Sequence, residues 1–241
     1  LHGGPVAALV VRTAERELGA TGGEGVTPVR LTIDLERPVP LTPLVVRANI
    51  VRPGRKVQVA EVTVHDDGGR RLVRATVLAI RREDLPLPAD RPCPDDPQPP
   101  PVDAPVEEGM WEPMGGEVVA YHKDGVEHRF VRGGFMRLGP TTDWIRLAVP
   151  VLPGETPSGF QRAVAAADFV NGISGTLPFD EWTFINPDLT VTLHRIPEGE
   201  WVALDAVTRL DASGVGTAEA DLFDEHGRIG RCVQTLIVQH R

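Results

Sequence analysis

Hydrophobic residues near the start of the chain recur every three to four positions. Val6, Val10, Ala14 and Leu18 fall on one helical face, and Pro5 suits the first turn of that helix. A glycine-rich turn follows at residues 19–25, and the pattern then changes to alternation of apolar and polar positions rich in β-branched residues. This alternation predicts four strands, at residues 29–36, 44–51, 56–65 and 72–82, with a hairpin turn at 66–69 between the last two.

The same order of elements returns later in the chain. A helix is expected at residues 158–173, where Ser158 stands three positions before Gln161 in a capping-box pattern. Four strands should follow, at residues 188–194, 201–210, 216–223 and 228–238. Three further strand-like segments precede this helix, at residues 117–121, 127–131 and 144–149. Their counterparts in the first copy would lie before Leu1, so we expect the intact protein to carry an additional N-terminal segment.

The two halves of the chain align at a fixed offset of 158 residues without a gap. Residues 31–37 (LTIDLER) lie over residues 189–195 (LTVTLHR), and residues 57–70 lie over residues 215–228. Repeats of this length are duplicated domains rather than turns of a solenoid. We therefore expect a first copy at 1–82, a connector at 83–115 and a second copy at 116–241. The connector is rich in proline, which favours an extended, semi-rigid conformation.

The predicted elements indicate a fold class. The helix centred on Val164 is apolar almost all round, which is typical of a helix surrounded by other elements. One helix followed by antiparallel strands forms an α+β unit, in which the sheet buries one face against the helix. A sheet curled around a central helix is the hotdog fold, so two copies in one chain predict a double hotdog.

Composition and charge exclude several classes of function. The formal net charge of −9 argues against a general nucleic-acid binder, because attraction to phosphates needs a basic surface. No segment has the pattern of a membrane span. The only cysteines, Cys93 and Cys232, are too few for a disulfide framework and unlike zinc ligands in spacing, which favours a reducing, cytoplasmic compartment. The motifs of serine hydrolases, zinc proteases and nucleotide-binding loops are absent, so we expect neither a metal nor another cofactor.

Three polar residues stand in the second copy where the first copy has valine, proline and threonine: Asp168, Asn186 and Gln234. A buried carboxylate is costly unless it is paired or used. Each residue also has a structural explanation, namely a carboxylate that is solvated or held by a neighbouring backbone N–H, a turn set by the following proline, and an edge-strand amide facing water. Their joint occurrence in one copy favours a functional site.

The segment His2, Gly3 and Gly4 stands at the start of the first helix. Free backbone N–H groups and the positive end of the helix dipole make such a position suitable for an anion or a carbonyl oxygen, and glycine lets a ligand approach closely. The alternative is that the two glycines form a flexible start to the helix. For a lone histidine such as His2, capping or packing is commoner than catalysis.

Several segments together resemble the acyl-CoA thioesterase II (TesB-like) group, in its thioesterase-like branch, over essentially the whole chain. They are residues 1–5 (LHGGP), 129–132 with 144–146, 167–172, 184–195 and 232–236. This resemblance implies a double hotdog that hydrolyses the thioester of a fatty acyl-CoA. In the family pattern a helix Asp, a Thr or similar polar residue and a last-strand Gln orient the water, which here implies Asp168, Asn186 and Gln234. Asn186 in place of Thr is a departure from that pattern.

The resemblance also implies the remaining roles. Asp168 would act as general base or water anchor, and backbone N–H groups near Gly3 and Gly4 would polarise the thioester carbonyl. The segment at residues 2–4 is similar to that of single-hotdog thioesterases, where the helix-start glycine faces a carboxylate of the partner subunit. We therefore expect one composite site between the two copies, acyl-CoA as the ligand and a dimer of double hotdogs.

Two other functions remain open at this point. A hotdog hydratase or dehydratase acting on acyl-CoA would use an Asp/His pair, but neither helix carries an Asp followed five residues later by His. A double hotdog that binds acyl groups without catalysis is the other alternative, because one fold can host many functions.

Overall fold

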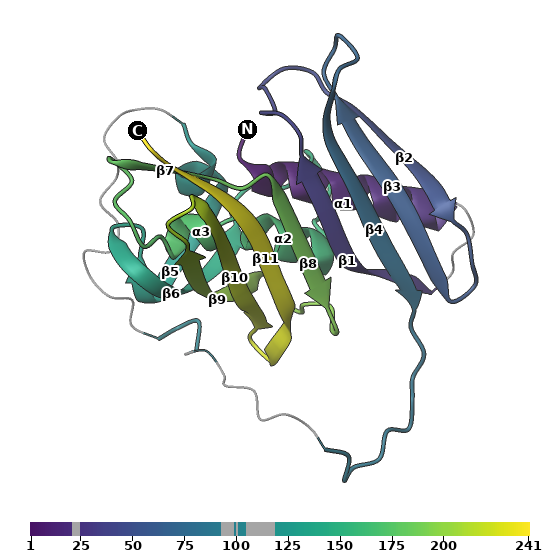
Figure 1. Ribbon diagram of the computed structural model, residues 1–241. Coiled ribbons are helices and arrows are strands. Elements are labelled where there is room, and N and C mark those ends of the chain that lie inside the picture. The colour runs from purple at the N-terminus through teal and green to yellow at the C-terminus, as the bar shows by residue number, and fades with distance from the viewer. Residues whose placement is uncertain (21–24, 93–98, 100, 105–118) are drawn as a thin grey trace.

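The computed structural model describes residues 1–20, 25–92, 99, 101–104 and 119–241. The first copy consists of one long helix and four antiparallel strands, in which β2, β3 and β4 pair in sequence and β1 pairs with β4 (Figure 1). Its elements are α1 (Gly3–Ala20), β1 (Val26–Leu35), β2 (Val45–Arg52), β3 (Val57–His65) and β4 (Arg71–Arg81).

The second copy repeats this arrangement and extends it. It begins with a single π-helical turn, η1 (Tyr121–Gly125), and a hairpin of two strands that has no counterpart among the described residues of the first copy. The elements after η1 are β5 (Val126–Gly134), β6 (Arg137–Leu147), α2 (Gly159–Ala167), α3 (Val170–Ile173), β7 (Trp182–Ile185), β8 (Asp188–Leu193), β9 (Trp201–Leu210), β10 (Val215–Asp224) and β11 (Gly227–His240).

The strands of both copies form one antiparallel sheet. Its order is β2-β3-β4-β1-β8-β11-β10-β9-β6-β5, with β7 paired to β11. The two copies join where β1 pairs with β8, and at the centre of this pairing Thr32 faces Thr190. These two threonines are counterparts in the repeat, so an approximate two-fold axis passes through the pair. The expected double hotdog is confirmed, with the two sheets fused into one.

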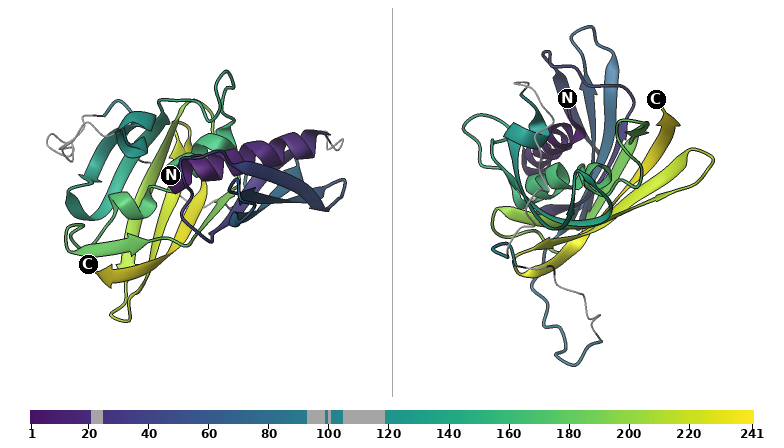
Figure 2. Two further views of the ribbon diagram at one scale, coloured as in Figure 1. Left: turned by 90° about the horizontal axis from the view of Figure 1, so that it is seen from above. Right: turned by 90° about the vertical axis from the view of Figure 1, so that its left-hand side faces the viewer.

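The sheet curves around the helices and buries them (Figure 2). Phe160 and every residue from Ala163 to Ala167 in α2 are buried, as the apolar pattern of that segment predicted. In α1, the predicted inner face of Val6, Val10, Ala14 and Leu18 is also buried. Helices α1 and α2 pack against each other in the hollow of the sheet, so residues at the end of one helix can reach the other copy.

Two expectations about single elements need correction, and one strand was not predicted. The expected helix at 158–173 is interrupted after Ala167 and resumes at Val170, which leaves Asp168 as the C-cap of α2. The expected strand at 117–121 is wrong in its described part, because Tyr121 begins η1. Strand β7 was not predicted. The expected connector at 83–115 lies partly outside the described residues, and so does Cys93.

No helix in the described part of the chain is long and apolar enough to cross a membrane.

Candidate active site

Asp168 is the central residue of the site. It lies at the C-terminal end of α2, where the backbone leaves the helix, and its side chain is 5% exposed. The alternative interpretation of Asp168 as a solvated carboxylate is therefore wrong. A buried carboxylate is stable only when hydrogen-bond donors surround it, and these donors come from three separate parts of the chain.

Two of the donors are side-chain amides that the sequence analysis singled out together with Asp168. Asn186 Nδ2 donates to Asp168 Oδ1 at 3.1 Å, and Gln234 Nε2 lies 3.3 Å from the same oxygen. Gln234 belongs to β11, which pairs on both sides with other strands, and its side chain is fully buried. The alternative of an edge-strand amide facing water is thus wrong. Pro187 O accepts a hydrogen bond from Leu35 N at 2.7 Å, which ties the Asn186 turn to the first copy.

The start of α1 supplies the remaining donors. His2 Nδ1 lies 2.7 Å from Asp168 Oδ2, and the Gly4 N–H is close enough to the Asp168 carboxylate to lower its pKa. At position 3, a Cβ atom would lie 2.7 Å from Asp168 Oδ1, and at position 4 it would lie 2.6 Å from Ala165 O. Only glycine fits between the helix start and the carboxylate. The two glycines are therefore a packed contact between the copies rather than a flexible start to the helix.

The protonation of this cluster follows from its contacts. Burial alone would raise the pKa of Asp168, but its contacts with His2, Asn186 and the Gly4 N–H outweigh burial and lower the pKa below its ordinary value. Asp168 is consequently ionised at neutral pH. The Gly4 N–H points at His2 Nδ1, with Gly4 N 3.1 Å away. Asp168 Oδ2 lies closer to Nδ1, at 2.7 Å, and this ionised carboxylate would repel a lone pair on Nδ1, so we assign the proton to Nδ1, which donates it to Asp168.

Aromatic rings hold His2 in place. The imidazole lies 4.5 Å from the ring of Phe169 and 5.2 Å from the ring of Tyr121, measured between centroids. Tyr121 and Phe169 are themselves stacked at 5.8 Å. Burial, together with the charge of Asp168, raises the pKa of Tyr121, so its phenol is neutral. His2 is thus fixed on its apolar sides by rings and on its polar edge by Asp168.

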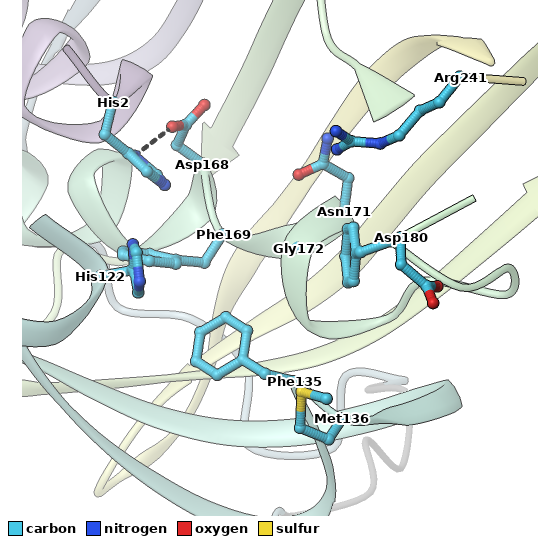
Figure 3. Close-up of a pocket in the computed structure, with 11 residues that line it drawn as sticks. His2, His122, Phe135, Met136, Asp168, Phe169, Asn171, Gly172, Asp180 and Arg241 are labelled. Carbon is cyan, nitrogen blue, oxygen red and sulfur yellow. Dashed lines mark ion pairs between the residues drawn. The ribbon is translucent and has the colours of Figure 1, made fainter. Parts of the chain in front are cut away.

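A cavity of about 400 Å3 opens beside the cluster (Figure 3). His2 and Asp168 form one end of it, while Asn171, Asp180 and Arg241 lie toward the other end. The wall between them is mainly apolar, with aromatic rings from three elements or loops, and is completed by Phe135, Met136, Phe169, Gly172 and Phe179. A buried, ionised carboxylate at one end of an apolar cavity can act on a polar group of a largely apolar ligand.

Sequence comparison assigns both copies to one family. Residues 1–80 match the acyl-CoA thioesterase N-terminal domain, and residues 92–238 match the acyl-CoA thioesterase C-terminal domain. The chain belongs to the acyl-CoA thioesterase family. A search of functionally curated proteins finds no match.

Several solved structures share the fold of this chain. A TesB protein from Mycobacterium avium subsp. paratuberculosis is 15% identical with a TM-score of 0.70, covering 99% of this chain and 87% of that one. An acyl-CoA thioesterase II from Mycobacterium marinum is also 15% identical with a TM-score of 0.70, covering 100% and 90%. A hotdog-fold protein of unknown function from Alicyclobacillus acidocaldarius is 20% identical with a TM-score of 0.70, covering 99% and 86%. At these identities the likeness shows the fold.

In this member of the family, the position related to the cluster by the repeat has a different character. The counterpart of Asp168 is Val10, which is fully buried, and the counterpart of Gly3 is Gln161. Gln161 Nε2 donates to Glu15 at 2.5 Å, and the Ser158 hydroxyl donates to the same carboxylate at 2.6 Å. A side chain thus stands where the first cluster has glycine, and no acid faces it from the position of Asp168.

The structure brings together all six residues singled out from the sequence, namely His2, Gly3, Gly4, Asp168, Asn186 and Gln234. Their catalytic roles stay predictions. Sequence reasoning missed the cavity walls, especially Phe135 and Met136 at the tip of the β5–β6 hairpin. Both residues lie in a hairpin that has no counterpart among the described residues of the first copy, and this difference between the copies could have pointed to them. The described residues hold no group of three or more His, Cys, Asp or Glu side chains suited to a metal ion.

The close contact between Gly3 and Asp168 can be tested by comparing alanine substitutions at two glycines of α1. Gly3→Ala should destabilise the protein by about 1–3 kcal/mol, because the new methyl group overpacks against the Asp168 carboxylate. In Gly19→Ala, the same change near the other end of α1 meets nothing within 4 Å and should instead stabilise by about 0.5–1 kcal/mol. Urea denaturation of both variants measures the difference. Equal effects at the two positions would show that Gly3 is not a close contact.

Proposed function

We propose that this protein hydrolyses the thioester of a fatty acyl-CoA, with a water held at the cluster of Asp168, Asn186 and Gln234. The observation that carries the proposal is the buried Asp168 carboxylate, fixed by donors from both copies at the end of an apolar cavity. Membership in the acyl-CoA thioesterase family supports the substrate class.

Gln234 offers a place for the water. Its Oε1 atom is buried and has no hydrogen-bond partner in the part of the chain that the structure describes. Buried polar atoms are normally satisfied by protein or water. The orientation of the amide is fixed, because its Nε2 faces the Asp168 carboxylate. A water that donates to Oε1 would lie beside Asp168.

The reaction forms a C–O bond and breaks a C–S bond. The water oxygen attacks the carbonyl carbon of the thioester while one of its protons passes to a base of the cluster. The tetrahedral intermediate then expels the thiolate, which takes up that proton, and the products are a carboxylic acid and free CoA. A backbone N–H at the start of α1 other than that of Gly4, which the cluster already uses, would polarise the carbonyl oxygen. Donors of this kind typically contribute about 100-fold to 1,000-fold in rate.

The acyl chain fits the apolar part of the cavity. The rings of Phe135, Phe169 and Phe179 line it together with Met136, and Gly172 of α3 leaves it open. With the thioester at His2 and Asp168, the chain would run along these side chains toward Asn171 and Arg241 (Figure 3). The acyl chain length that the protein prefers should therefore depend on the size of the residue at position 172.

Hydration or dehydration of an acyl-CoA is a second candidate. The sequence offered no Asp/His pair within one helix, but the structure forms one between the copies, with His2 Nδ1 at 2.7 Å from Asp168. A MaoC-like dehydratase shares the fold at a TM-score of 0.51 and 14% identity. Assays separate the candidates, because hydrolysis releases a free thiol, whereas hydration changes the enoyl absorbance without releasing one.

The cytoplasmic location and the dimer of double hotdogs expected from the sequence stay predictions.

The role of Asp168 is tested by substitution. Asp168→Asn should keep the fold and lower kcat for acyl-CoA hydrolysis about 100-fold or more, since shape is nearly conserved while the charge is lost. Thiol release from acyl-CoA measures this effect. The matched change in the other copy, Val10→Asn, buries an amide in the core and should lower stability while the folded fraction keeps its kcat. Wild-type kcat in Asp168→Asn would refute the mechanism.

The acyl pocket is tested at Gly172. A Cβ atom there would meet only Phe135, at 4.0 Å, so a larger side chain would project into the cavity. Gly172→Leu should reduce kcat/KM for long acyl chains relative to short ones by about 10-fold or more, whereas Gly172→Ala should change the ratio little. A panel of acyl-CoAs of increasing length measures the ratio. An unchanged ranking of chain lengths in Gly172→Leu would place the acyl group elsewhere.

A further inference from the structure

We propose that His2 is the proton acceptor for the hydrolytic water, through its Nε2 atom, and that Asp168 acts as a positioning residue for His2. This inference rests on the proposed hydrolysis and assigns the proton transfer within it. It differs from the expectation for His2, which was an oxyanion or substrate-binding role, and from the expectation that Asp168 itself takes the proton.

The contacts of Asp168 leave it little capacity to accept a further hydrogen bond. An ionised carboxylate offers about four acceptor positions. His2 and the two amides occupy three of these positions, and the Gly4 N–H lies near the carboxylate. The same donors lower the pKa of Asp168, which makes the carboxylate a weaker base. A group that is surrounded by donors and weakly basic is better suited to orient a neighbour than to take a proton.

His2 has the geometry that Asp168 lacks. With the proton on Nδ1 and directed at Asp168, the other ring nitrogen, Nε2, carries the lone pair. Nε2 makes no hydrogen bond to any residue that the structure describes, and the ring edge opposite Asp168 points toward the cavity (Figure 3). The side chain is 26% exposed, so water can reach it. Its orientation is fixed by Phe169 and Tyr121.

The proton balance of the step is complete without another reactant. Nε2 takes one proton from water as the water oxygen bonds to the carbonyl carbon, which yields an imidazolium ion beside the Asp168 carboxylate. The negative charge of Asp168 stabilises this ion. When the C–S bond breaks, Nε2 returns the proton to the leaving thiolate, and His2 is neutral again. The same pattern of carboxylate, histidine and attacking oxygen operates in serine hydrolases, with serine in place of water.

A second His–Asp pair in the molecule serves as a comparison. His128 Nδ1 lies 2.5 Å from Asp143, a distance similar to that in the His2 pair. However, the His128 side chain is only 8% exposed, and its ring is packed against Phe130, Phe135 and Phe169. His128 does not line the cavity that His2 and Asp168 share, but a separate hollow with Glu127 and Phe130. Of the two pairs, only the one at His2 lies at the cavity with the long apolar wall.

The pH dependence of the reaction reports which group takes the proton. The titratable groups around His2 are Asp168 at the end of α2 and, from η1, the neutral phenol of Tyr121 and His122, which also lines the cavity and whose pKa is lowered mainly by burial. Only neutral His2 can accept a proton. If His2 is the base, the pH profile of kcat/KM should therefore differ between the wild-type protein and a His2→Phe variant. If Asp168 or His122 were the base, the shape of the profile would be the same in both.

The test compares kcat/KM for thiol release from one acyl-CoA between pH 4 and 9. His2→Phe keeps the stacked ring and should lower kcat about 100-fold to 10,000-fold and change the shape of the pH profile. His2→Ala should regain activity when free imidazole is added, because the small base can occupy the vacated space. Asp168→Asn should gain nothing from imidazole. His226→Phe alters an exposed histidine beside Glu198 that does not line the cavity, and should leave kcat unchanged.

Two results would overturn the inference. One is a His2→Phe variant that retains the wild-type kcat and pH profile. The other is a pH profile of the same shape in the wild-type protein and His2→Phe, combined with no rescue of His2→Ala by imidazole. Circular dichroism of each variant establishes that it is folded. Absence of thiol release by the wild-type protein from every acyl-CoA tested would instead refute the proposed hydrolysis, and the assignment of His2 with it.

Discussion

Burial of the Asp168 charge is the constraint on which the rest of the site depends. Removing a carboxylate from water costs many kcal/mol unless donors replace the water. Here the donors come from the start of α1, the turn between β7 and β8, and the central strand β11. These three parts can meet only when the two copies are joined through β1 and β8. The fused sheet is therefore a requirement of the site as well as of the core.

Duplication explains both the symmetry of the fold and the asymmetry of its chemistry. The pairing of Thr32 with Thr190 relates the two helices by an approximate two-fold axis, so each helix start faces the end of the other helix. Where the start of α1 meets the end of α2, Gly3 leaves room for the Asp168 carboxylate. At the other junction, Gln161 and Ser158 donate to Glu15, whose pKa is raised by burial despite these bonds. The second junction is thus a structural contact, which leaves the first junction for the proposed composite site.

Much of the fold could be predicted from the sequence because alternation and helical spacing report burial directly. The strands of both copies and the inner face of α1 followed from such patterns, and the offset of 158 residues related the copies. Other features depend on contacts between distant residues. The break of the helix at Asp168 and the helical turn at Tyr121 leave no periodic signal. Strand β7 is only four residues long, too short for a pattern.

The site shows the same division. Asp168, Asn186 and Gln234 could be found because each replaces an apolar or small residue of the other copy. The pairing of His2 with Asp168 could not be derived from spacing, since the two residues belong to different copies and meet only through the packing of α1 against α2. The aromatic clamp on His2 and the walls formed by Phe135 and Phe179 likewise arise from tertiary packing.

The central claim is that each chain contains a single composite site between its two copies. Isothermal titration calorimetry with a non-hydrolysable thioether analogue of an acyl-CoA tests this claim most directly, because it counts binding sites per chain. The account predicts one analogue bound per chain. Binding of two analogues per chain with similar affinity would contradict it, because the junction at Gln161 would then also be a site.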